Sequence, residues 1–114
     1  MAERRDPELI RDIVEAIDRI QRYTAGFTYA AFLQDTRTQD AVVRNLEVLG
    51  EAAKGLSADY RGSRKEISWN EIARMRDRLI HHYFGVNWEI VWDVICNKLP
   101  ELKAQLGTMS GREG

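Results

Sequence analysis

The fold is organised around one stretch of sequence, RDRLIHHY at residues 76–83, which follows the run ISWNEIARM and precedes Gly85. No residue that breaks helices stands between Trp69 and Gly85. Glycine is also the residue most often found just past the end of a helix. The stretch therefore predicts one helix over residues 70–84.

One residue departs from the amphipathic pattern of this helix. On a wheel at about 100° per residue, one half is apolar. Its members are Ile72, Ala73, Met75, Leu79, Ile80, Tyr83 and Phe84. Arg76 projects from the middle of that half, where an unpaired charge costs several kcal/mol of desolvation. We therefore expect Arg76 to have a partner, a wet cleft or a function, and Glu51 or Asp40 are possible ion-pair partners.

The pattern R-x-x-x-x-H-x-Y, formed by Arg76, His81 and Tyr83, resembles the signature of HEPN-domain ribonucleases. It is most similar to the HepT branch, the toxin halves of HepT–MntA toxin–antitoxin pairs. In that branch the residue after the arginine is polar, as Asp77 is here. Other segments follow the order associated with HepT proteins, namely QDA at 39–41, GEAAK at 50–54, ISW at 67–69 and LPEL at 99–102. The resemblance covers nearly the whole chain.

These residue types suit RNA cleavage without a metal ion. A histidine can act as the base or the acid near neutral pH, so His81 is a candidate catalytic residue. The planar guanidinium of Arg76 matches phosphate oxygens and can stabilise the crowded phosphate, which makes Arg76 the second candidate. Asp77 lies one helical turn before His81 and can orient its imidazole. Tyr83 can bond a phosphate or stack on a base, and the lesser alternative is a core aromatic residue whose hydroxyl bonds a backbone carbonyl.

The resemblance implies a specific biological role. It implies a metal-independent endoribonuclease that acts as the toxin of a type VII HepT–MntA system. The partner would be an MntA-like nucleotidyltransferase antitoxin that adenylylates Tyr83. Members of this family usually form homodimers in which two motifs line one cleft. A non-catalytic dimeric helical module that binds a nucleotidyltransferase or a nucleotide is the alternative, with Arg76 and His81 structural.

Composition limits the other possibilities. A chain of 114 residues with 44% hydrophobic residues, 31% charged residues and only two prolines suggests one all-α domain. The net charge of −1 does not indicate a nucleic-acid-binding domain, so any RNA contact requires a local basic patch. The candidates are Arg61, Arg64, Lys65, Arg74 and Arg78. Several of them fall in the polar stretch 57–68, which we expect to be a loop, and a merely solvated basic loop is an equal possibility.

Metal, membrane and export signals are missing from the sequence. Cys96 is the single cysteine, which leaves no intrachain disulfide, and we expect it to be a small buried residue. His81 and His82 are adjacent and point to different sides, so no metal site is expected. No cofactor motif is present. The lack of a signal peptide or a membrane-length apolar run favours a cytoplasmic protein.

The remaining sequence divides into helices by its capping residues. Asp6 is expected to cap a first helix that ends at Gly26. A helical turn follows Thr28, and Asp35 or Thr36 caps a second long helix. Gly50 inside that helix suggests the close approach of another helix, with a kink as the lesser possibility.

The last part of the chain forms one more long helix and a short one. Asn87 caps that fourth main helix, and Pro100 predicts a break before a short last helix. We therefore expect an antiparallel bundle of four main helices plus one or two short ones, HEPN-like in fold. The domain spans residues 1–107, and residues 108–114 are expected to be a disordered tail.

Overall fold

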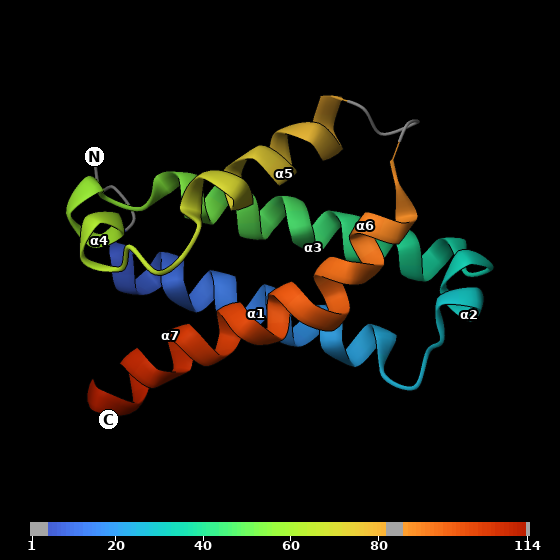
Figure 1. Cartoon of the computed structure of the whole chain (residues 1–114), viewed down its shortest axis with the longest axis horizontal. Coiled ribbons are helices and arrows are strands. Elements are labelled where there is room, and N and C mark those ends of the chain that lie inside the picture. The colour runs from blue at the N-terminus through green and yellow to red at the C-terminus, as the bar shows by residue number, and fades with distance from the viewer. Residues whose placement is uncertain (1–4, 82–85, 114) are drawn as a thin grey trace.

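The computed structural model describes residues 5–81 and 86–113, and all regular elements in these ranges are helical (Figure 1). They are α1 (Asp6–Thr24), α2 (Tyr29–Leu33), α3 (Thr36–Gly55), α4 (Ala58–Ser63), α5 (Trp69–His81), α6 (Trp88–Asp93), a π-helical segment (Val94–Lys98) and α7 (Leu99–Glu113). The prediction of an all-α fold is confirmed. The four main segments are α1, α3, α5 and the α6–α7 rod, with α2 and α4 as short additions.

The helix α3 occupies the centre of the bundle. It packs against α1 on one side and α5 on the other, and α7 packs against α1. Successive long helices run in opposite directions, as Figure 1 shows. The fully buried side chains come mainly from α1 and α3; the largest are Phe32, Ile13, Ile17, Ile20, Leu46, Leu49, Leu106 and Val42. The core therefore lies between α1, α3 and α7, and α5 lies at its edge.

Several helix boundaries agree with the capping residues in the sequence. The side chains of Thr28, Asp35 and Asn87 accept hydrogen bonds from backbone N–H groups in the first turns of α2, α3 and α6. Gly26 follows α1 with a φ of 80°, a conformation that glycine adopts without strain. The boundary of α5 beyond His81 was predicted at Gly85, which lies outside the described residues.

Two predictions at the start of the chain and before α5 are wrong. Arg5, not Asp6, is the N-cap of α1. The Asp6 carboxylate instead accepts hydrogen bonds from the backbone N–H (2.9 Å) and hydroxyl (2.6 Å) of Ser57. The Ser57 side chain also caps α4, so the expected loop contains a short helix. Ser57 thus joins the first turn of α1 to the segment that leads into α5.

The expected break at Pro100 is replaced by a wider helical turn. The chain passes from α6 to α7 through the π-helical segment, and the Leu99 N–H donates to the Val94 carbonyl. The wider turn accommodates Pro100, which has no N–H to donate, without ending the helix. Within this turn Ile95 is buried and Cys96 is exposed, so the expectation that Cys96 is buried is wrong.

The C-terminal helix is longer than the sequence suggests. The helix α7 runs from Leu99 to Glu113, whereas a short last helix was expected. The domain boundary at residue 107 and the tail stay predictions. Glycines at 107 and 111 lower the helix propensity of this segment without excluding a helix.

Candidate functional site

The site begins where α3 and α5 cross. Gly50 is buried there, and a Cβ atom added to it would overlap Cβ and Cγ of Arg76 and lie 3.4 Å from its Cα. Any larger residue at position 50 would push the two helices apart. The expectation that Gly50 permits a close helix approach is confirmed, and the residue approached is the motif arginine.

Arg76 is held by carboxylates from both helices. Its side chain is 23% exposed, with Nη2 at 2.6 Å from Oε1 of Glu51 on α3. Its Nη1 lies 3.2 Å from Oδ1 of the adjacent Asp77. Its Nε is buried and has no hydrogen-bond acceptor among the described residues. Glu51 is therefore the partner that the apolar position of Arg76 requires.

Asp77 belongs to the same network. Its Oδ1 also lies 3.4 Å from Nζ of Lys54 on α3. The hydrogen bond from Arg76, reinforced by Lys54, lowers the pKa of the Asp77 carboxyl below its ordinary value of 3.8. Lys54 was not among the predicted site residues. Its signal was the spacing of Glu51 and Lys54, which places both side chains on one face of α3.

The other two motif residues lie at or beyond the end of α5. His81 is the last residue of α5. Its side chain and the whole of Tyr83 lie outside the described part of the structure. The orienting contact from Asp77 to His81 and the roles of His81 and Tyr83 therefore stay predictions.

Three of the five candidate RNA-contacting residues surround one pocket. Arg61, Lys65 and Arg74 line a hollow of about 610 Å³ beside the first turn of α5, together with Ala58, Gly62, Ile67, Ser68, Trp69, Asn70 and Glu71. The N-terminus of a helix adds partial positive charge to such a place. Arg78 is exposed one helical turn beyond Arg74 on α5. The structure thus places four of the candidates along one end and one side of α5.

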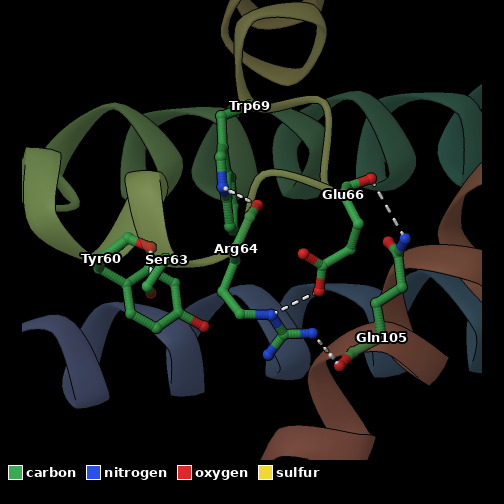
Figure 2. A network of polar contacts seen from close by, with 6 residues as sticks. All are labelled: Tyr60, Ser63, Arg64, Glu66, Trp69 and Gln105. Carbon is green, nitrogen blue, oxygen red and sulfur yellow. Dashed lines mark hydrogen bonds and ion pairs between the residues drawn. The ribbon is translucent and has the colours of Figure 1, made fainter.

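The fifth candidate, Arg64, has partners inside the domain (Figure 2). Its side chain is 14% exposed, with Nε donating to Oε2 of Glu66 (2.6 Å) and Nη2 donating to the carbonyl of Gln105 on α7 (2.8 Å). The indole N–H of Trp69 donates to the Arg64 carbonyl (3.2 Å). Arg64 therefore ties the segment before α5 to α7 instead of lining the pocket.

Residues 5–81 and 86–113 also bear on metal binding and membrane insertion. The described residues contain no group of three or more His, Cys, Asp or Glu side chains that could hold a metal ion. Over the same ranges, the helices are too short or too polar to cross a membrane.

Comparison with known proteins identifies the family. Residues 13–109 match the family model described as ribonuclease HepT-like. The chain is 48% identical to "Putative RNase MJ0127" of Methanocaldococcus jannaschii over 78% of this chain and 74% of that protein. It is 43% identical to "Probable ribonuclease HepT" of Thermococcus cleftensis over 86% and 89% of the two chains, respectively. No solved structure matches. The chain therefore belongs to the HepT-like ribonucleases of the HEPN superfamily.

Proposed function

We propose that this chain is a metal-independent endoribonuclease that acts as the toxin of a type VII toxin–antitoxin pair. The observation that carries the proposal is Arg76, a partly buried arginine at the crossing of α3 and α5 in a chain of this family. Natural sequences tend to keep such a costly charge where it has a function. Arg76 would stabilise the charge on the scissile phosphate, and His81 would transfer the proton.

The pocket beside α5 supports an RNA substrate. Arg61, Lys65 and Arg74 line it, and Arg78 continues the positive charge along the helix. These charges can bind successive phosphates of a single strand, although the net charge of the chain is −1. The proposed path for RNA therefore runs along α5, from the pocket toward Arg76 and His81.

The proposed control acts on the same helix. An MntA-like nucleotidyltransferase would transfer an adenylyl group from ATP to the Tyr83 hydroxyl and release pyrophosphate. The added phosphate would compete for the cation that the RNA phosphate needs. In a homodimer, where two copies of the motif would share a cleft, the nucleotide would also obstruct that cleft. Each of these steps is a proposal based on the family.

The test is cleavage of RNA by the purified protein in the presence of EDTA. We expect the wild type to cleave RNA and His81→Ala to be inactive at equal fold stability. Dependence on added metal, or full activity of His81→Ala, would contradict the proposal. Intact-mass measurement with the partner and ATP tests the control, since Tyr83→Phe should not gain an adenylyl group.

One observation favours the alternative of a non-catalytic helical module. Both terminal nitrogens of Arg76 are paired with carboxylates of the same chain, as in a purely structural ion-pair network. Such a module would bind its nucleotidyltransferase partner without cleaving RNA. The same assay separates the two functions, because the module would show no activity that depends on His81.

A further inference from the structure

The guanidinium of Arg76 is already occupied when no RNA is bound. Glu51 lies 2.6 Å from Nη2, and Asp77 lies 3.2 Å from Nη1. Carboxylates and phosphates present similar oxygen pairs to the arginine fork. A phosphate that binds both terminal nitrogens must therefore displace at least one of these carboxylates.

The two carboxylates are not equally easy to displace. Asp77 neighbours Arg76 in sequence and is also held by Lys54 of α3. The Glu51 side chain is 65% exposed, and its described ion pair is the one to Arg76. Ion pairs with such an exposed member contribute little to stability, because water readily replaces the partner. Glu51 is the carboxylate that can swing into solvent.

We propose that Glu51 occupies the place of an RNA phosphate on Arg76 and is exchanged for it when RNA binds. This inference rests on the proposed function, in which Arg76 binds phosphate. Glu51 keeps the partly buried guanidinium paired and oriented in the free protein, since an unpaired charge there is costly. It also weakens RNA binding, because the substrate has to compete with a carboxylate tethered to the same domain.

The test is binding of a single-stranded 2′-O-methyl RNA, which lacks the hydroxyl that cleavage requires. We expect Glu51→Gln to bind about twofold to fivefold more tightly than the wild type, the range that corresponds to losing one exposed ion pair. The salt dependence should also steepen, by up to about 0.7 in the logarithmic slope. In this variant the RNA phosphate would displace a counterion from Arg76. In the wild type it displaces the Glu51 carboxylate, and no counterion is released at this position.

The matched control is Glu15→Gln. Glu15 pairs with Arg19 on α1 and is similarly exposed, at 62%. This variant changes the net charge equally, so it measures the general electrostatic effect. Unchanged affinity and slope in Glu51→Gln, or equal tightening in both variants, would overturn the inference.

A double-mutant cycle assigns the effect to Arg76. In an Arg76→Gln background, which thermal unfolding must show to be folded, Glu51→Gln should no longer tighten binding. Persistent tightening there would overturn the inference. The single variant Arg76→Gln tests the proposed function separately: if it binds as tightly as the wild type, Arg76 is not a phosphate ligand.

Discussion

Gly50 sets how closely the motif helix can approach the core. In Gly50→Ala, the new Cβ would meet Cβ and Cγ of Arg76 at the crossing of α3 and α5. Overpacking of this kind costs about 1–3 kcal/mol, partly offset by the higher helix propensity of alanine, about 1 kcal/mol. We expect a net loss of stability in urea unfolding, together with lower ribonuclease activity, because Arg76, the proposed phosphate ligand, would be displaced.

Gly107 provides the control for that substitution. It lies within α7, and a Cβ added there would have no neighbour within 4 Å. Gly107→Ala should therefore be stabilised by about 0.5–1 kcal/mol through helix propensity alone. Equal shifts in the two variants would show that the α3–α5 crossing has room for a methyl group.

Asp35 makes stability depend on pH. Hydrogen bonds from Thr38, the backbone one foremost, lower the pKa of the Asp35 carboxyl below its ordinary value of 3.8. The pKa of Asp35 is lower in the folded state than in the unfolded state. The contribution of its carboxylate to the free energy of unfolding is therefore complete above the unfolded-state pKa. It is lost as the pH falls through the folded-state pKa, which lies below 3.8. Asparagine also caps helices but does not titrate there, so Asp35→Asn should unfold in urea with a shallower acid dependence. An unchanged dependence would contradict this role.

Single residues were predictable where the signal was local. The caps Thr28, Asp35 and Asn87 follow from their own side-chain chemistry. The conflict between Arg76 and its apolar surroundings predicted a partner, a wet cleft or a function, and the structure shows the partner Glu51. The identity of the carboxylate that pairs with Arg76 could not be predicted in the same way, because it depends on how α3 and α5 cross, and that is a long-range property. Lys54 was missed for the same reason, since its link to Asp77 joins two helices.

The segment between α3 and α5 contains two basic neighbours with different environments. Arg64 bonds to Glu66 and to the Gln105 carbonyl, whereas Lys65 is exposed and lines the pocket. We expect Arg64→Ala to lose about 1–2 kcal/mol of stability, because it removes hydrogen bonds made by a charged group. Lys65→Ala should keep its stability but bind RNA more weakly and with a smaller salt slope.

If Arg64→Ala weakened RNA binding without a loss of stability, Arg64 would again be an RNA-contacting residue. If Arg64→Ala unfolds like the wild type and reduces the salt slope, its bonds in Figure 2 are exchanged for phosphate when RNA binds. Urea unfolding and RNA titrations on both variants decide between these roles.

Helical elements were predicted well where the apolar periodicity extends over many residues. They were predicted less well where helix-breaking or polar residues competed with packing. Pro100 suggested a break, but packing of Ile95, Leu99, Leu102 and Leu106 favours a continuous rod with one wide turn. Likewise, the polar composition of residues 57–68 concealed the short helix α4, because its Ser57 cap acts with Asp6, far away in the sequence.

At the scale of the whole molecule, α3 separates the motif helix from the largest part of the core. The principal extents are 40 × 30 × 26 Å, and the radius of gyration of 14.3 Å exceeds the roughly 13 Å expected for a compact domain of this length. The described ion pairs of Arg76 are with Glu51 of α3 and Asp77 of α5, so they lie where these two helices cross. Figure 1 shows α5 and α1 on opposite sides of α3. A partner that covers α5 would therefore reach the site without touching α1.

The position of α1 has a consequence for how mutations act in a living cell. Ile17 is completely buried on α1, a helix that contributes none of the candidate site residues, and Ile17→Ala should cost about 2–5 kcal/mol. A loss of that size lowers the amount of folded protein that escapes degradation. If the chain acts as the proposed toxin, Ile17→Ala should relieve toxicity through low abundance on an immunoblot, with normal ribonuclease turnover per folded molecule. His81→Ala, which removes the proposed catalytic histidine, should accumulate to wild-type levels but lack turnover. The two variants would then lose activity for different reasons, one through the amount of folded protein and the other through the proposed chemistry.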